Sequence, residues 1–360
     1  MSLYTFATRA LHALSPEDAH TATIRLLKAG LGPVSRLDTP QLAVDVPFDG
    51  GMLHFPNCIG LAAGFDKNAE VPAAMLRSGF GFVECGTVTP LPQAGNPKPR
   101  LFRLTEDEAV INRMGFNNEG LDAFGRNLRG LGGGVVGLNI GANKDAADRV
   151  ADYVTGLKRL WGGAKGNGSG SYFTINISSP NTPGLRALQG RSHLDDLLGR
   201  IQAERTALRS QSGRNMPIFL KIAPDLDEAE IADTVESAIQ HGLDGMIVSN
   251  TTLARDGLRS SFAGESGGMS GVPLFERATA ALRTARVASG GQILLIGAGG
   301  VRDGATAYAK IRAGASLVQL YSAMVYRGPG LADTVRRELS ALLAADGFAS
   351  VTEAVGVDQI

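Results

Sequence analysis

Short apolar runs alternate with helical stretches along most of the chain. The runs lie at residues 59–64, 82–88, 135–141, 172–178, 218–223, 245–250, 293–299 and 317–323, and each resembles a strand buried on both faces. Helical spacing of apolar residues occupies intervals at 70–79, 193–210, 227–242, 273–289 and 304–314. Eight strand–helix units in about 250 residues favour an α/β fold of the closed (β/α)8 TIM-barrel type over an open doubly wound sheet. The stretch IGLAAGFDKN after the first run also lacks the GxGxxG of a dinucleotide-binding sheet.

The residues before the first run predict a separate extension. A first segment has apolar residues at helical spacing, at Leu3, Phe6, Ala7, Ala10, Leu11 and Leu14. Ser15 and Pro16 then follow the pattern of an N-cap and a first helical position, and a second helix should stop at Gly30. Residues 41–56 alternate and turn at 49–51, which indicates a hairpin. We expect a two-helix extension over 1–40 and a barrel domain over 41–360.

Composition and charge exclude several classes of protein. With 44% hydrophobic and 19% charged residues, the chain can bury a large core. Lys and Arg number 35, as do Asp and Glu, so no net field attracts nucleic acid or acidic lipid. No apolar run reaches the ~18 residues of a membrane span, and the N-terminus lacks a secretory signal. Cys58 and Cys85 stand in apolar runs without metal-ligand spacing, and we expect buried, reduced thiols.

Polar residues gather where the apolar runs end. In a (β/α)8 barrel, catalytic groups lie at the carboxyl ends of the strands. The residues at those ends are 64–67, 86–87, Asn139, 176–181, Lys221, 249–251, 297–300 and 321–322. They are rich in lysine, asparagine and small hydroxyls, without the His, Asp and Glu grouping that suits a metal. We expect the functional site to be built from this ring, with no metal.

Glycines and lysines within the ring point to an anionic ligand. The glycines of 296–300, together with 320–322 and the loop 267–271, are typical of a barrel phosphate site, although glycines also form plain tight turns. Lys67 and Lys221 each follow a buried strand. A lysine in such a place is a Schiff-base nucleophile, a fixed cation, or the partner of a nearby carboxylate. The nearby carboxylates here are Asp66 and Asp225.

Carboxamides point to a flat polar ligand. The asparagines near the strand ends are Asn112, Asn139, Asn176, Asn181 and Asn250. Each offers an acceptor and two donors, so several of them together suit a ring with alternating N–H and C=O groups, such as a pyrimidine. A single asparagine at a strand end is more often a turn residue.

A series of stretches in the same order resembles one known family. They are LAAGFDKNAE (61–70), ECGTVTPLPQAGNPKPRLFRL (84–104), INRMGFNNEG (111–120), GLNIGANK (137–144), INISSPNTPGLRALQ (175–189), FLKIAPDL (219–226), SNTTL (249–253), GGMSGVPL (267–274), IGAGGV (296–301) and GASLVQLYSAMVYRGP (314–329). SPEDAH (15–20) extends the match into the leader. The chain resembles the membrane-associated, quinone-dependent class 2 dihydroorotate dehydrogenases over nearly its whole length.

The resemblance implies an FMN enzyme that oxidises dihydroorotate to orotate in pyrimidine synthesis. The FMN contacts that it implies are Ala63, Gly64, Phe65, Asp66, Lys67, Thr87, Asn139, Asn176, Lys221, Ser249, Gly271, Gly300, Tyr321 and Ser322. The substrate contacts that it implies are Lys67, Asn112, Arg113, Met114, Gly115, Phe116, Asn176, Asn181, Asn250 and Thr251. Most of these residues belong to the strand-end ring described above.

The resemblance also implies a catalytic base. In class 2 members the base is a serine in the loop after the fourth strand, which is Ser179 here, whereas class 1 members have a cysteine. Pro180 and Pro183 would stiffen this loop. A serine hydroxyl is a poor base at neutral pH, so it needs a relay such as a water and Thr182. The alternative is that Ser179 is an ordinary turn residue.

The leader gains a role from the resemblance. Class 2 members use such a helix pair as an apolar lid that touches the membrane and admits quinone, and the implied quinone path is His20, Arg103 and Tyr321. We expect a monomer bound peripherally to the cytoplasmic face of a bacterial cell membrane, because the chain starts at residue 1 without a long presequence. The alternative is an arm that only docks on the barrel or on a partner.

Two other functions remain open from the sequence. The first is a soluble FMN barrel oxidoreductase that uses fumarate or NAD, against which the leader and Ser179 argue. The second is a non-enzymatic barrel that binds a phosphorylated ligand. That barrel would keep the glycine corner but would not need Lys67, Ser179 and the asparagines together.

Overall fold

The strands form a closed parallel barrel, as predicted. The computed structural model describes residues 13–129, 131–162 and 170–359. The barrel strands are β3 (Ile59–Leu61), β4 (Phe82–Val88), β7 (Val135–Ile140), β8 (Tyr172–Asn176), β9 (Ile218–Ile222), β10 (Gly245–Val248), β12 (Leu294–Ala298) and β13 (Leu317–Leu320). Their order is β10-β12-β13-β3-β4-β7-β8-β9, and β9 pairs with β10 to close the ring. The (β/α)8 prediction is confirmed.

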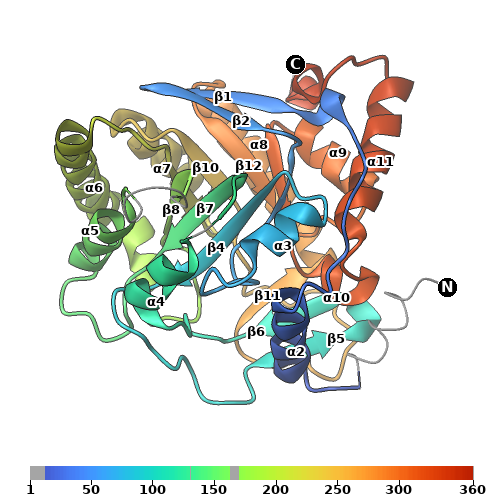
Figure 1. The fold of residues 1–360 in the computed structure, drawn as a ribbon, viewed down its shortest axis with the longest axis horizontal. Helices are drawn as coiled ribbons and strands as arrows, with labels where there is room; N and C mark the ends of the chain where they lie inside the picture. Colours follow the sequence, from blue (N-terminus) through green and yellow to red (C-terminus); the bar gives the residue numbers. More distant parts are fainter. Residues whose placement is uncertain (1–12, 130, 163–169, 360) are drawn as a thin grey trace.

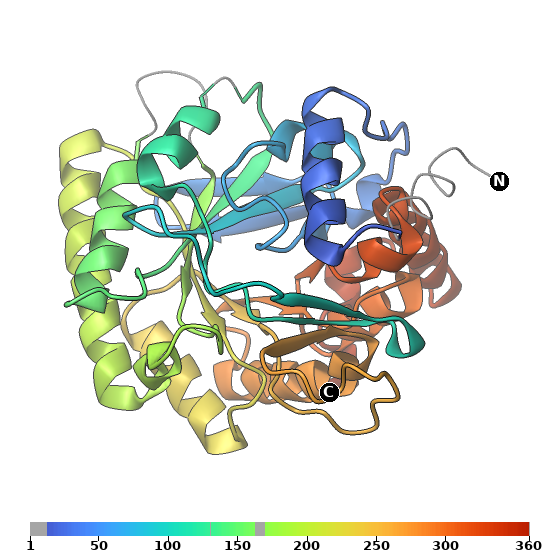
Figure 2. The ribbon, with the colours of Figure 1, turned by 90° about the horizontal axis from the view of Figure 1, so that it is seen from below.

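Helices surround the barrel (Figures 1 and 2). They are α3 (Pro72–Arg77), α4 (Gly120–Asn127), α5 (Arg149–Leu160), α6 (Arg191–Ser212), α7 (Glu228–Gln240), α8 (Phe275–Ser289), α9 (Gly304–Arg312), α10 (Ala323–Arg327) and α11 (Leu331–Ala345). Short 3-10 turns occupy Pro40–Leu42, Thr105–Asp107, Leu185–Gln189, Val272–Leu274, Val351–Ala354 and Val357–Gln359. Local signals explain several starts: Asp227 and Glu230 form a capping box on α7, and Asp303 caps α9.

The two ends of the barrel are closed differently (Figure 1). The predicted hairpin is β1 (Val44–Phe48) and β2 (Gly51–Phe55), paired through Phe48 and Gly51. It covers the amino-terminal end, where the buried ring of Phe55 packs edge-on against Phe82 at 5.1 Å between centroids. The leader helix and a small sheet cover the opposite end, where the strands finish. The carboxyl ends of the strands therefore face the leader helix and the small sheet.

The small sheet was not predicted. β5 (Leu101–Leu104), β6 (Ala109–Asn112) and β11 (Gly268–Gly271) pair antiparallel in the order β11-β6-β5. They enclose a second apolar cluster that includes Phe102, Ile111 and Met269. β11 is too short and glycine-rich to show a strand pattern, and its partner lies far away in the sequence. This sheet brings Asn112 and Gly271 to the rim of the barrel.

The leader prediction is confirmed for its second helix. α2 spans Pro16–Lys28, and the Ser15 hydroxyl accepts a hydrogen bond from the Asp18 amide at 3.3 Å. Gly30 follows with a φ of 78°, in the left-handed region that ends helices. The first predicted helix falls almost wholly on residues 1–12, outside the described residues. No helix among the described residues is long and apolar enough to cross a bilayer.

Candidate active site

One cavity opens at the carboxyl ends of the barrel strands. Its volume is about 350 Å³, and residues of the barrel, the small sheet and α2 line it. Of the predicted residues, the lining includes Ala63, Gly64, Phe65, Lys67, Thr87, Asn112, Met114, Gly115, Phe116, Asn176, Ser179, Asn181, Lys221, Ser249, Asn250, Thr251, Gly271, Gly300, Tyr321 and Ser322. His20 and Arg103 also line it. The polar ring expected from the sequence thus surrounds a single space.

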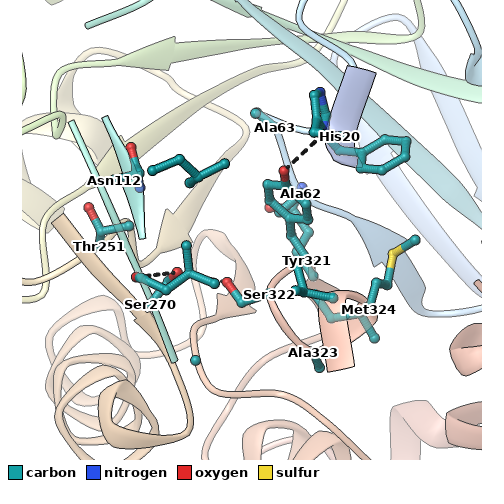
Figure 3. Close-up of a pocket in the computed structure, with 18 of the residues that line it drawn as sticks. His20, Ala62, Ala63, Asn112, Thr251, Ser270, Tyr321, Ser322, Ala323 and Met324 are labelled. Carbon is teal, nitrogen blue, oxygen red and sulfur yellow. Dashed lines mark hydrogen bonds between the residues drawn. The ribbon is translucent and has the colours of Figure 1, made fainter. Parts of the chain in front are cut away.

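Glycines shape one corner of the cavity. Gly300 has a φ of 76°, and a Cβ there would lie 2.5 Å from the Cα of Phe275. Gly271 has a φ of 102°, and a Cβ there would lie 2.4 Å from the carbonyl oxygen of Glu108. Both neighbours are backbone atoms that cannot swing away, so only glycine fits. Beside this corner the Ser322 hydroxyl donates to Ser270 at 2.7 Å (Figure 3). The corner presents backbone and small hydroxyls to a ligand.

The two lysines line the cavity without a carboxylate in direct contact. In the part of the chain that the structure describes, neither the Lys67 nor the Lys221 ammonium group has a hydrogen bond or ion pair with another side chain. Asp66 instead accepts from the amides of Glu70 and Val71, at 2.8 and 2.7 Å. The alternative in which each lysine pairs with its nearest carboxylate is therefore wrong.

Burial weakens the basicity of both lysines. It lowers the pKa of Lys67 to about 8. It also lowers the pKa of Lys221, and the charge of Glu84 opposes this shift. Asp225, the other carboxylate considered from the sequence, binds Arg186 at 2.8 Å. An anionic ligand would thus meet two cations that no protein carboxylate neutralises by contact.

The carboxamides form a connected wall. The Asn176 amide nitrogen donates to the Thr87 hydroxyl at 2.8 Å, and the Asn250 amide nitrogen donates to Ser178 at 2.8 Å. On the rim, the Asn181 amide nitrogen donates to the Asn112 carboxamide oxygen at 3.2 Å. These contacts join the loop after β8 to β6 and to the end of β10. Asn112 and Thr251 stand on this side in Figure 3.

Ser179 lies in a nearly dry part of this wall. The residue is 5% exposed, and its hydroxyl oxygen accepts from the backbone amide of Asn181 at 3.3 Å. Arg186 holds the loop through the Ser178 carbonyl at 3.0 Å. No carboxylate or imidazole of the described residues accepts from the Ser179 hydroxyl. The buried hydroxyl oxygen of Thr182 has no hydrogen-bond partner among the described residues.

The opposite wall belongs to the leader. The Nδ1 atom of His20, which is on α2, lies 3.5 Å from the hydroxyl oxygen of Tyr321 (Figure 3). Phe65 packs edge-on against both rings, at 5.4 Å from His20 and 5.6 Å from Tyr321. Burial, followed by the charge of Lys67, lowers the pKa of His20 to about 3, so the imidazole is neutral at ordinary pH. Arg103 donates to the carbonyl of Leu14.

Three predicted residues lie off the cavity wall. Asp66 caps the backbone of the segment before α3. Asn139 is fully buried behind Thr87, whose hydroxyl donates to it at 2.6 Å. Arg113 points outward, pairs with Glu265 at 2.6 Å and lies 4.6 Å from the centre of the Phe102 ring. These residues support the site from behind.

Sequence reasoning missed Gln319 and Glu84. Gln319 lines the cavity from β13, and Glu84 is fully buried in β4. Each is a polar residue inside an otherwise apolar run, LVQLY and FVECGTV. A charged residue within a barrel strand is costly to bury, so this signal was available in the sequence.

Comparison with known proteins agrees with this site. The model of the dihydroorotate dehydrogenase family matches residues 49–343. A dihydroorotate dehydrogenase (quinone) of Rhizobium johnstonii is 56% identical over 96% of this chain and 94% of its own length. One of Parvibaculum lavamentivorans is 53% identical over 99% of both chains.

Solved structures of dihydroorotate dehydrogenase are also similar to this chain. The ligand-free dihydroorotate dehydrogenase of Eimeria tenella is 42% identical, with a TM-score of 0.89 over 96% of this chain and 100% of that one. The same enzyme in complex with ferulenol also has a TM-score of 0.89, over 96% of each chain. The chain belongs to the dihydroorotate dehydrogenase family.

Proposed function

We propose that the protein oxidises dihydroorotate to orotate in pyrimidine synthesis, with FMN as the bound hydride acceptor and a membrane quinone as the final acceptor. The observation that carries this proposal is one continuous cavity with three different walls. Ser179 and the carboxamides form a substrate wall, glycines form a phosphate corner, and α2 forms an apolar entrance. A family in which many relatives bear the name of the quinone enzyme supports the same reading.

The residues present fit FMN. Gly271 and Gly300 leave a backbone cradle that a Cβ would fill, beside Ser322, which suits a phosphate. Gln319 has a buried carboxamide oxygen without a partner among the described residues, which suits an N–H of the ring. Lys67 and Lys221 add positive charge. The other residues that would hold FMN are Ala63, Gly64, Phe65, Thr87, Asn176, Ser249 and Tyr321, backed by Asp66 and Asn139. FMN, when bound, supplies the two-electron redox chemistry.

Dihydroorotate would bind against the carboxamide wall. Lys67 would face its carboxylate, because this cation has no protein partner among the described residues. Asn176, Asn181 and Asn250 would hold the amide edges of the ring. The remaining contacts would come from Asn112, Met114, Gly115, Phe116 and Thr251, with Arg113 behind them. This arrangement orients the ring and excludes water.

Ser179 would take the proton from C5 of the substrate through its hydroxyl oxygen. The neighbouring amide of Asn181 already donates to that oxygen and orients it. The proton must then leave the serine, because a protonated hydroxyl is a strong acid. Thr182, whose buried hydroxyl oxygen is unpartnered among the described residues, would pass it on with a water.

Quinone would enter between α2 and the segment after β13. Leu26, Leu31, Met324 and Pro329 line this side of the cavity. His20, Arg103 and Tyr321 would form the polar end of the path. Leu31 and Val34 are 65% and 66% exposed beside the entrance, where a lipid surface would cover them. The protein would thus be a monomer bound peripherally to the cytoplasmic face of the bacterial cell membrane.

Oxidation of dihydroorotate by the purified protein in detergent tests the proposal. A ubiquinone analogue, fumarate or NAD is supplied as the only acceptor, and orotate is measured by absorbance. We expect turnover with the quinone alone. Turnover with fumarate or NAD alone would contradict the proposed acceptor, and no orotate with any acceptor would contradict the proposed substrate.

A further inference from the structure

A buried carboxylate lies beneath the cavity. Glu84 on β4 is fully buried and accepts four hydrogen bonds. The donors are Asn139 at 2.7 Å, Tyr172 at 3.2 Å, Thr174 at 3.1 Å and Gln319 at 2.9 Å, from strands β7, β8 and β13. Since all four partners donate, they suit an ionised, acceptor-only carboxylate. A buried charge without such partners would strongly destabilise the fold.

The carboxylate sets the direction of a chain of hydrogen bonds. Because an amide nitrogen only donates, Asn139 turns its nitrogen to Glu84 and its oxygen to Thr87. The Thr87 hydroxyl donates its single proton to that Asn139 oxygen. Toward Asn176 the Thr87 oxygen is therefore an acceptor, and the Asn176 side-chain nitrogen donates to it. The Asn176 oxygen is therefore left for Ser178, which donates to it at 2.8 Å. One charge thus orients polar groups up to the cavity wall.

The same carboxylate orients Gln319. The Gln319 nitrogen donates to Glu84, so its oxygen must point elsewhere. That oxygen is buried and has no partner among the described residues, although Gln319 lines the cavity. The Glu84 charge also acts on Lys221, because it partly opposes the lowering of the Lys221 pKa by burial. The carboxylate therefore leaves an oriented acceptor, the Gln319 oxygen, in the layer of side chains directly beneath the cavity.

We propose that Glu84 is a positioning residue for the flavin ring, which orients Thr87, Asn176 and Gln319. This inference rests on the proposed FMN site. Glu84 does not line the cavity and takes no part in proton or hydride transfer. It acts through side chains that do line the cavity.

The test compares Glu84→Gln with Tyr172→Phe in the full-length chain. Tyr172→Phe removes one donor to the carboxylate but keeps its charge and its hydrogen bonds from Asn139 and Gln319. FMN affinity is measured by fluorescence as the apoprotein is reconstituted, and the absorption bands of bound FMN are recorded. Melting of both apoproteins gives their stability.

We expect Glu84→Gln to weaken FMN binding at least about tenfold and to shift the flavin bands, because an amide cannot accept from all four donors. Tyr172→Phe should change affinity by less than about twofold, although it also loses stability. Equal losses of affinity in both variants, or unchanged affinity and bands in Glu84→Gln, would overturn the inference. Failure of the unmodified apoprotein to bind FMN would instead overturn the proposed function.

A second variant keeps the test decisive if Glu84→Gln does not fold. Gln319→Met retains the carboxylate but removes the oriented oxygen. We expect it to bind FMN about fivefold more weakly and to shift the flavin bands. Unchanged binding and bands in Gln319→Met would show that the orientation of this side chain does not matter.

Discussion

At the scale of single residues, the site places weak acids and bases where water is scarce. Ser179 is 5% exposed, and Lys67 has a pKa lowered to about 8, mainly by burial. Each group is poorly suited to its proposed role in water. In a dry cavity, a fixed cation and an oriented hydroxyl act more strongly, because the effective dielectric constant is low. Two predictions follow from these side chains.

Ser179→Ala should slow flavin reduction by dihydroorotate. We expect a fall of about 10²- to 10⁴-fold, because the variant has no hydroxyl oxygen to take the C5 proton. Stopped-flow absorbance measures this step without quinone. FMN content and orotate affinity serve as controls and should stay within about threefold of the unmodified protein. A rate within about threefold of the original would exclude Ser179 as the base.

Lys67 should make orotate binding depend on pH. Its lowered pKa means that the cation is present below about pH 8 and is lost as the pH rises through that value. An anionic ligand should therefore bind more weakly above about pH 8, and Lys67→Met should remove this dependence. The dissociation constant of orotate, followed by the flavin spectrum, measures both. If the orotate dissociation constant of Lys67→Met changed with pH as it does in the unmodified protein, the titrating group would not be Lys67.

At the scale of elements, α2 is attached to the barrel by ion pairs of different burial. Glu17 binds Arg100 at 2.7 Å, and both side chains are largely buried. Arg100 also donates to the carbonyl oxygens of Ala94 and Asn96, at 2.6 and 2.8 Å. At the other end of α2, Lys28 binds Glu70 at 2.6 Å, but Lys28 is 52% exposed. The Glu17–Arg100 pair should hold α2 on the barrel more strongly than the Lys28–Glu70 pair, because solvent screens the exposed Lys28 charge.

Glu17→Gln should therefore loosen α2 more than Lys28→Gln does. We expect quinone-dependent turnover to fall about three- to tenfold in Glu17→Gln and to change little in Lys28→Gln. At saturating dihydroorotate and a pH well below 8, where Lys67 stays charged, flavin reduction should be nearly unchanged in both variants, because Ser179 is not on this helix. Hydrogen exchange over residues 16–28 reports the attachment directly. Equal exchange in the two variants would contradict this ranking.

At the scale of the whole molecule, one group of exposed apolar residues lies beside the cavity entrance. Leu26, Leu31 and Val34 are exposed beside the cavity entrance, while the hairpin closes the opposite end. Net charge is zero, so attraction to charged lipid should be weak. Membrane binding should then depend on the apolar area that enters the lipid surface.

Leu31→Ser should weaken binding to vesicles of zwitterionic phospholipid by about five- to thirtyfold, since partial burial of one leucine contributes about 1–2 kcal/mol. Val287→Ser is the matched control, because Val287 is 68% exposed on α8 and Leu31 is 65% exposed. Co-sedimentation measures both. Equal weakening by the two changes would mean that the entrance is not the membrane-facing surface.

Part of the fold could be predicted from sequence, and most of the predicted site residues do line the cavity. The barrel strands and α2 carry local patterns of apolar spacing and capping, which depend on neighbours in the chain. Many of the site residues followed from one rule, because parallel strands in a closed barrel end on the same side. Others, such as Met114, Gly115 and Phe116, came only from the family resemblance. Residues such as Arg113 and Asn139 could not be placed in this way, since their partners Glu265 and Thr87 lie far away in sequence.

The sequence by itself determined the alternation of strands and helices and the polar chemistry at the strand ends, because both depend on residue type and spacing. The tertiary structure alone decided the pairing of β11 with β6, the four partners of Glu84 and the attachment of α2 by Arg100. These contacts join segments that are distant in the chain, and no local pattern encodes them. They exist only once barrel closure has brought the strand ends together.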